Sequence, residues 1–254
     1  MATSVGYRLP AWRLFKNDTM NFFDQLLIWD KQTLLTINSY HQPWLDRFMW
    51  LVSESLLWLP LALAFVLILF RNKGNKALFI LLALGLLILF TDQVASSIIK
   101  PLVERFRPSH DPEFGDWVNL VNGYKGGRYG FISSHAANVF AFAGFSLLLV
   151  RNWPYTVLVL LWASLVAFSR IYLGVHFPLD VICGGLFGFL SGWGMYALYA
   201  AFFERQMHAS RSRSMRTDRK TTNGEFKKTD IGLFLTALIL VLVTAVIAAH
   251  KLAW

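Results

Sequence analysis

Long apolar stretches recur along this chain, and they restrict its fold more than any other feature. A helix that crosses a bilayer needs about 20 apolar residues. Of the whole chain, 56% is hydrophobic and only 15% is charged, which is too apolar for an ordinary soluble domain. We therefore predict an all-α fold, an integral membrane bundle of six transmembrane helices. The six apolar stretches cover residues 56–70, 77–99, 136–150, 154–172, 179–203 and 231–249.

The segment before these stretches, residues 1–47, is mixed in character. It predicts an N-terminal amphipathic helix lying in the membrane interface, with packing on the rest of the protein as the alternative. The first membrane span is then expected to begin near Phe48 or Trp50 and to include Glu54. The amphipathic helix has Phe22, Phe23, Leu26 and Leu27 on its apolar side and Asp24, Gln25, Asp30 and Lys31 elsewhere.

Basic residues indicate how the six spans are oriented. The turns 71–76 and 151–153 and the linker 204–229 carry twelve Lys and Arg residues, and simple alternation puts them on one side. The positive-inside tendency makes that side cytoplasmic, so the loop 100–134 and the turn 173–178 face outward. The chain then divides into an N-terminal segment (1–47), a membrane core (48–203), a basic cytoplasmic linker (204–229) and a C-terminal transmembrane helix (230–254).

Two features of the fifth span concern packing. Gly184, Gly188 and Gly192 repeat every four residues, a spacing of small residues that lets two helices approach closely. The single cysteine, Cys183, lies in the same apolar stretch, so an intrachain disulfide is excluded and we expect a packing role. Both features predict a tightly packed helix rather than a ligand site.

The formal net charge of +9 indicates which partners to expect. A nucleic-acid-binding protein would show a basic face with interleaved aromatic residues, and we find none outside the membrane segments. The positive charge instead suits loops beside an anionic membrane surface and a site for an anionic head group. Membrane lipids, and not nucleic acid, are therefore the expected partners.

Three polar clusters lie at or near the ends of the apolar stretches. A bilayer penalises buried charge, so cations, histidines and a carboxylate at these places need a functional reason. The predicted topology puts all three clusters on the same side of the membrane. The clusters are Lys100-x6-Arg107-Pro108, then Ser133-Ser134-His135, then Ser169-Arg170-x5-His176-x3-Asp180.

The third cluster has the pattern of a nucleophile with its orienting group. His176 and Asp180 are four residues apart and share one helical face. A carboxylate on one ring nitrogen fixes the tautomer and leaves the other nitrogen free to attack. The planar fork of Arg170 suits two phosphate oxygens. The alternative is a structural His–Asp pair beside an arginine that reaches the interface.

The other two clusters would bind and protonate a phosphate. Ser133 or Ser134 is a natural helix N-cap, and the free N–H groups there suit an anion, while His135 is placed to protonate a leaving oxygen. Lys100 and Arg107 are separated by two turns of helix, about 10 Å. Simple capping and interfacial anchoring are the alternatives. Taken together, the clusters supply three cations for a group that carries roughly −1.5 to −2 charges.

These residues resemble the type 2 phosphatidic acid phosphatase family, whose pattern is K-x6-R-P, P-S-G-H and S-R-x5-H-x3-D. The first and third motifs match fully, and the second has Ile132 in place of proline and Ser134 in place of glycine. The resemblance covers roughly residues 40–203. It implies a phosphohistidine on His176, orientation of that ring by Asp180 and protonation of the leaving group by His135. It also implies that the phosphoryl oxygens are held by Lys100, Arg107, Ser133, Arg170 and the amide of Ser134.

The resemblance implies a hydrolase without metal or cofactor that acts on a lipid phosphate or diphosphate. Undecaprenyl diphosphate ranks first, followed by phosphatidylglycerol phosphate, phosphatidic acid and the phosphates of lipid A. Transfer of the phosphate to another lipid is an alternative. A lipid transporter using Glu54 and Asp92 is the non-enzymatic alternative. We expect the bacterial inner membrane, with the site on its outer, periplasmic face, and the oligomeric state stays open.

Overall fold

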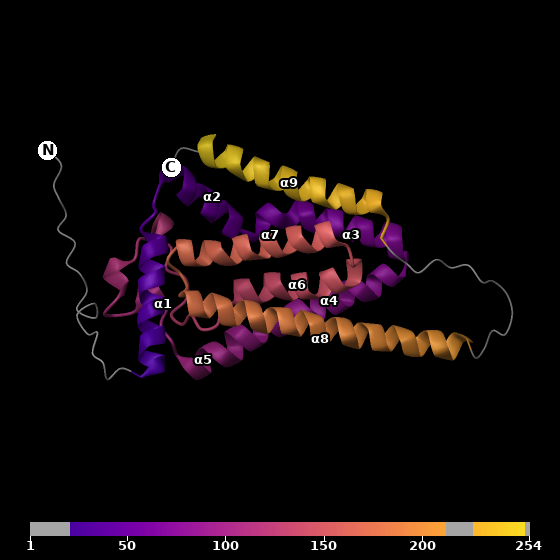
Figure 1. The fold of residues 1–254 in the computed structure, drawn as a ribbon, viewed down its shortest axis with the longest axis horizontal. Helices are drawn as coiled ribbons and strands as arrows, with labels where there is room; N and C mark the ends of the chain where they lie inside the picture. Colours follow the sequence, from indigo (N-terminus) through magenta and orange to yellow (C-terminus); the bar gives the residue numbers. More distant parts are fainter. Residues whose placement is uncertain (1–20, 212–225, 252–254) are drawn as a thin grey trace.

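The computed structural model describes residues 21–211 and 226–251, with side-chain positions for residues 21–202 and 226–251. Helices make up most of this part, as predicted (Figure 1). The α-helices of the described residues are α1 (Phe22–Asn38), α2 (Pro43–Ser53), α3 (Leu59–Lys73), α4 (Lys76–Gln93), α5 (Lys100–Val103), α6 (Ser134–Val150), α7 (Trp153–Tyr172), α8 (Pro178–Arg211) and α9 (Lys228–Lys251).

Helices α3, α4, α6, α7, α8 and α9 run along the bundle, with α6 and α7 between the others (Figure 1). Five of the predicted spans are long and apolar enough to cross a membrane by length and composition. The remaining predicted span, 136–150, corresponds to α6, which has only 17 residues. At about 1.5 Å per residue it is shorter than a hydrocarbon core of about 30 Å, and Ser134 and Ala136 at its start are buried.

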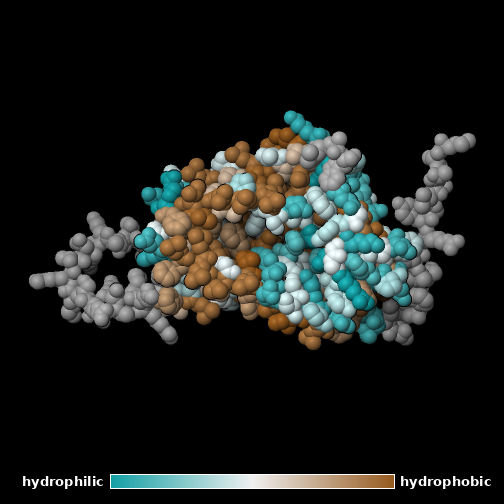
Figure 2. Space-filling model, turned by 180° about the vertical axis from the view of Figure 1, so that it is seen from behind, coloured by the Kyte–Doolittle hydropathy of each residue, from teal (hydrophilic) through white to brown (hydrophobic). Residues whose placement is uncertain are grey.

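On the face shown in Figure 2, apolar side chains cover a broad band of the bundle, and polar residues gather toward its ends. Large side chains such as Leu67, Leu82, Leu190 and Leu240 are exposed on α3, α4, α8 and α9. Exposed leucine on several neighbouring helices is unfavourable in water and favourable in lipid. The described part of the chain therefore forms an integral membrane protein.

The glycine repeat packs α8 against α6, as predicted. A Cβ atom added to Gly188 would lie 2.0 Å from the carbonyl oxygen of Ala137, and one added to Gly184 would lie 2.5 Å from that of Ser133. One added to Gly192 would lie 2.3 Å from the carbonyl oxygen of Ala141. Only glycine permits this approach, which brings the beginnings of the two helices together.

Three boundaries differ from the sequence prediction. The first span begins after Glu54, where the backbone is extended between α2 and a short 3₁₀ turn, Ser55–Trp58. The second span continues through Pro101 to Val103, because the wide π-helical turn Val94–Ile99 precedes the proline and has already left regular helical bonding. Helix α8 continues to Arg211, into the segment predicted as linker.

Helix α1 lies across one end of the bundle (Figure 1). Phe22 and Phe23 are exposed, in agreement with an apolar side, but Asp30 is fully buried although the sequence put it among the polar residues of an interfacial helix. Asn38 fixes the end of α1, since its amide donates to the carbonyl oxygens of Asn119 and Tyr172. Contact with the bundle therefore buries one side of α1, and its location in the membrane interface stays a prediction.

Candidate active site

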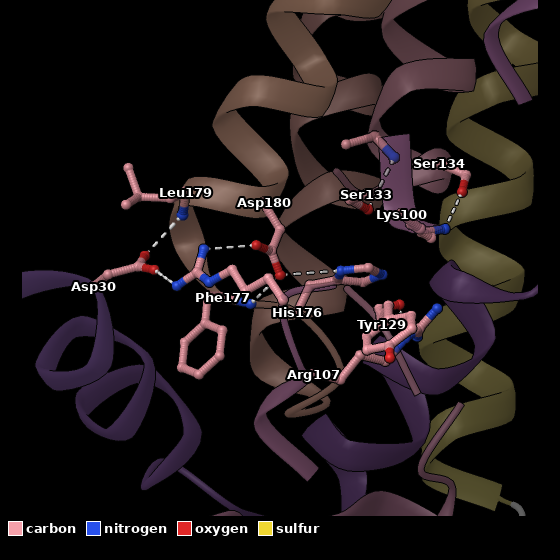
Figure 3. A network of polar contacts seen from close by, with 12 residues as sticks. Asp30, Lys100, Arg107, Tyr129, Ser133, Ser134, His176, Phe177, Leu179 and Asp180 are labelled. Carbon is pink, nitrogen blue, oxygen red and sulfur yellow. Dashed lines mark hydrogen bonds and ion pairs between the residues drawn. The ribbon is translucent and has the colours of Figure 1, made fainter. Parts of the chain in front are cut away.

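The three polar clusters meet at the end of the bundle that α1 covers (Figure 3). Lys100 follows α4, Ser133 and Ser134 begin α6, Arg170 lies in the last turn of α7, and Asp180 lies in the first turn of α8. Alternation of the helix directions brings these four ends together, as the predicted topology requires. The site is therefore assembled from segments distant in sequence.

Arg107 is held by the loop between α5 and α6. The loop folds back on itself, so that the backbone N–H of Arg107 donates to Arg128 and that of Gly130 donates to Arg105, at 3.0 and 2.8 Å. The Arg107 side chain donates through Nε to the carbonyl oxygen of Tyr129 at 3.2 Å. A Cβ atom on Gly126 would lie 2.4 Å from Arg107 Nη1, so the loop packs directly on the guanidinium.

The start of α6 carries the second cluster. The buried Ser133 caps the helix, with Oγ accepting from the N–H of Ala136 at 3.4 Å, and its own N–H donates to the carbonyl oxygen of Asp180 at 2.9 Å. Ser134 Oγ accepts from Lys100 Nζ at 2.5 Å and lies 3.0 Å from Ser96 Oγ. The sequence analysis expected only the amide of Ser134 to act, whereas its hydroxyl positions the lysine.

His176 and Asp180 form the predicted pair in the turn between α7 and α8. His176 Nδ1 lies 3.4 Å from Asp180 Oδ2, which also accepts from the N–H of Phe177 at 3.0 Å. Both side chains are at least 99% buried. With the proton of the ring on Nδ1, the lone pair is on Nε2, as nucleophilic attack requires. The distance of 3.4 Å is long for a hydrogen bond, which is common in a site without substrate.

Two arginines of the site carry buried nitrogen atoms without a hydrogen-bond partner. These atoms are Nη1 of Arg107 and Nε of Arg170, and the statement holds for the residues that the structure describes. Arg170 also donates through Nη1 to Ser53 Oγ on α2. A buried donor left unpaired costs about 1–3 kcal/mol or more when it is charged. The donors therefore fit an anion that binds between the two guanidinium groups.

Electrostatic interactions join the members of the site. His135 is exposed, and it lies within electrostatic range of Arg170, His176, Arg107 and Lys100. Burial, followed by the charges of Arg107, Arg170 and Lys100, holds the pKa of His176 well below its ordinary value. His176 is consequently neutral at physiological pH, the state that a nucleophile needs.

The sequence analysis missed several residues that support the site. Arg105 lies inside the six-residue spacer of the first motif and forms an ion pair with Asp180 at 2.7 Å. Ser53 accepts from Arg170 and Ser96 contacts the Ser134 hydroxyl that holds Lys100, and neither Ser53 nor Ser96 belongs to a motif. Asp92, considered for a transporter, accepts from Asn138 of α6 at 3.4 Å and so pairs with a neighbouring helix. For Ser53 and Ser96, the available signal was a polar residue within or beside an apolar stretch.

The acidic residues of the loop between α5 and α6, Asp111, Glu113 and Asp116, do not suggest a metal site. Among the residues described, no group of three or more His, Cys, Asp or Glu side chains is arranged so that it could hold a metal ion. Asp111 instead forms an ion pair with Lys31 at 3.4 Å. The expectation that the enzyme needs no metal stays a prediction.

Known proteins match this chain over the segments that build the site. The model of the PAP2 superfamily matches residues 76–204, which include all three clusters. Lipid A 4'-phosphatases of Porphyromonas gingivalis and Bacteroides thetaiotaomicron are 42% and 40% identical to it, over 71% and 66% of this chain and 77% and 75% of theirs.

A solved structure agrees with the same assignment. The crystal structure of a transmembrane PAP2 type phosphatidylglycerolphosphate phosphatase from Bacillus subtilis has a TM-score of 0.50 and 26% identity. The match covers 72% of this chain and 88% of that one. The chain therefore belongs to the PAP2 superfamily, and it is an integral-membrane phosphatase.

Proposed function

We propose that this phosphatase removes a phosphate from a lipid head group through a phosphohistidine on His176. The observation that carries the proposal is the pair of buried, unpartnered guanidinium nitrogens on Arg107 and Arg170 beside a neutral histidine. Cations that the protein itself leaves unpaired favour a ligand with several negative oxygens. The exposed apolar side chains along the bundle suit the acyl chains of the same ligand.

The proposed reaction has two steps at phosphorus. In the first, His176 Nε2 attacks, an N–P bond forms, the P–O bond to the lipid breaks, and His135 gives its proton to the departing oxygen. In the second, water attacks phosphorus, His135 takes a proton from it, and the N–P bond breaks to release inorganic phosphate. Lys100, Arg107 and Arg170 balance the negative charge of the phosphoryl group throughout.

Asp180 and the start of α6 complete the proposed mechanism. The carboxylate of Asp180 holds the proton on Nδ1 and stabilises the positive charge that the ring gains during attack. Ser133 and the backbone N–H groups at the start of α6 offer donors and the positive end of a helix dipole. The phosphoryl oxygens lie between this helix end and the arginines in the proposed complex.

The proposed substrate is a phosphate of lipid A. The two relatives named above, at 42% and 40% identity, are lipid A 4'-phosphatases. Lipid A thereby moves from the last place among the predicted substrates to the first, and undecaprenyl diphosphate becomes the second candidate. Because the three motifs contact the phosphate and not the remainder of the lipid, only the relatives favour one head group over another.

We also propose that the site faces the periplasm from the inner membrane of a bacterium. The turns 71–76 and 151–153, which carry Lys and Arg, lie at the end of the bundle opposite the site. The positive-inside tendency assigns that opposite end to the cytoplasm. A cysteine accessibility assay in spheroplasts, with single cysteines at positions 74 and 124 in protein that also carries Cys183→Ala, tests this orientation.

Release of inorganic phosphate by the purified protein tests the function. The substrate panel contains lipid A, undecaprenyl diphosphate, phosphatidylglycerol phosphate and phosphatidic acid, each in mixed micelles. We expect the fastest release from lipid A and none above background from His176→Ala. Equal activity of His176→Ala and wild type would contradict the phosphohistidine, and transfer of phosphate to lipid without free phosphate would favour the phosphotransferase alternative.

A further inference from the structure

Asp180 has two carboxylate oxygens, and the proposed mechanism uses only one of them. Oδ2 contacts His176 and the N–H of Phe177. Oδ1 accepts from Arg105 Nη1 at 2.7 Å. The orientation of this carboxylate therefore depends on a residue outside the matching motif positions.

Arg105 joins two buried carboxylates. Its Nη1 contacts Asp180 and its Nη2 contacts Asp30 of α1, so the planar fork spans both groups. The guanidinium also lies over the ring of Phe177, 4.5 Å from the ring centroid, which limits its movement. Arginine can make such a bridge because its donors have a fixed planar geometry, which lysine lacks.

Asp30 fixes the far end of the bridge. Its side chain is fully buried, with Oδ2 on Arg105 and Oδ1 accepting from the N–H of Leu179 at 2.8 Å (Figure 3). Leu179 lies in the first turn of α8, one residue before Asp180. Asp30 therefore contacts both the backbone next to Asp180 and Arg105, which is the side-chain partner of Asp180. A buried aspartate on α1 is thereby tied to the catalytic turn.

The neighbours of Asp180 explain why such a bridge is needed. Lys100 and Arg107 both lie within electrostatic range of this carboxylate. Without a partner for Oδ1, the carboxylate would be free to rotate and to pair with one of these two cations instead of His176. The ion pair with Arg105 opposes that rotation, and it leaves Lys100 and Arg107 available to a phosphate.

We propose that Arg105 and Asp30 are positioning residues of the phosphatase, which hold Asp180 toward His176 and thereby fix the tautomer of the nucleophile. The inference rests on the proposed function of His176. It also gives α1 a defined task, since the helix contributes Asp30 to the support of the site. Neither residue contacts the phosphate in this arrangement.

The test compares Arg105→Gln, Arg105→Lys and Asp30→Asn with wild type in phosphate release. We expect Arg105→Gln to lower kcat roughly 10- to 100-fold, with a smaller change in KM, because misplacement of a reacting group acts mainly on the chemical step. Arg105→Lys should restore part of the loss. In the double variant Asp30→Asn with Arg105→Gln, the two effects should not add, because both substitutions interrupt the same series of contacts from Asp30 through Arg105 to Asp180.

The tautomer of His176 provides a readout that does not depend on activity. In histidine-labelled protein, ¹⁵N NMR should show one Nδ1-protonated tautomer in wild type and a mixture of tautomers in Arg105→Gln. The signal is assigned by its disappearance in His176→Gln. If wild type released no phosphate, the proposed function would fail, whereas the tautomer comparison would still decide the inference.

The matched control is Asp111→Asn. It removes the charge from the Lys31–Asp111 ion pair, which also joins α1 to the loop but does not touch Asp180. We expect its kcat to stay within about threefold of wild type, as for most surface changes. An equal loss in Asp111→Asn, or an unchanged kcat and tautomer in Arg105→Gln, would overturn the proposal. Asp30→Asn carries the same test if Arg105→Gln does not fold.

Discussion

A buried aspartate begins a helix at each end of this bundle, and the two differ in what surrounds them. Asp230, in the first turn of α9, accepts from Asn72 at 2.8 Å and pairs with Arg71 at 3.1 Å. Asp180, in the first turn of α8, pairs with Arg105, yet two more arginines beside it keep unpartnered nitrogens. At the first end one arginine balances the buried acid, whereas the second end has more cations than acids.

The comparison separates structural charge from functional charge. A buried acid with a paired base indicates only that two helices are fastened together. An excess of buried cations is unfavourable for folding and persists where a ligand completes the balance. The contrast therefore identifies the site end without reference to any motif.

Removal of one of the excess cations should produce the largest effect. In Arg107→Met, phosphate release should fall roughly 10²- to 10³-fold, as for loss of a donor that stabilises a transition state. The midpoint of thermal unfolding should stay equal or rise, because an unpaired buried charge is lost. Activity and thermal unfolding in detergent are measured together. Arg71→Met at the other end should keep activity, and a matching loss there would break the comparison.

The fit between α6 and α8 is the next most sensitive feature. Gly184→Ala places a Cβ atom 2.5 Å from the carbonyl oxygen of Ser133, so the start of α6 must move away from Asp180. We expect kcat to fall roughly 10- to 100-fold, in line with about 1 Å of misplacement. Gly232→Ala on α9 meets nothing within 4 Å and serves as the control. Unchanged kcat in Gly184→Ala would show that the helices tolerate separation.

Ser134 should have a smaller effect that appears in substrate binding. In Ser134→Ala, Lys100 loses the hydroxyl that holds its ammonium at 2.5 Å. The KM for the lipid phosphate should rise roughly 3- to 10-fold, consistent with the loss of one hydrogen bond to a charged group. Ser97→Ala, which removes a hydroxyl bonded only to Gln93, is the control. A KM equal to that of wild type would remove Ser134 from the site.

The smallest effect concerns pH. Since the pKa of His176 is held below its ordinary value of 6.5, the ring stays neutral as pH falls and gains a proton only below that value. At about pH 6, kcat/KM, which reports the pKa values of the free enzyme, should therefore remain above half of its plateau. Histidine NMR of the substrate-free protein measures the same protonation directly. A midpoint for His176 at or above 6.5 would contradict the electrostatic account of the site.

Much of the site could be predicted from sequence because its residues have local signatures. Lys100, Arg107, His135, Arg170, His176 and Asp180 were all selected, and alternation of the spans put them at one end. The contact of the Ser134 hydroxyl with Lys100 was not predicted, because the two residues lie 34 positions apart in the sequence. The sequence shows serine at position 134 where the family motif has glycine, but it does not show what the serine side chain contacts.

The sequence by itself determined the helical class, the approximate spans and the close glycine contact, because apolar length and small-residue spacing act locally along a chain. Only the tertiary structure decided which residues Asp30, Arg105 and Ser53 contact. Asp30 was expected on the polar side of an interfacial helix, yet it is buried against residues 75 and 149 positions away. Which charges become buried, and with which partners, depends on how distant segments pack, and periodicity carries no record of those pairings.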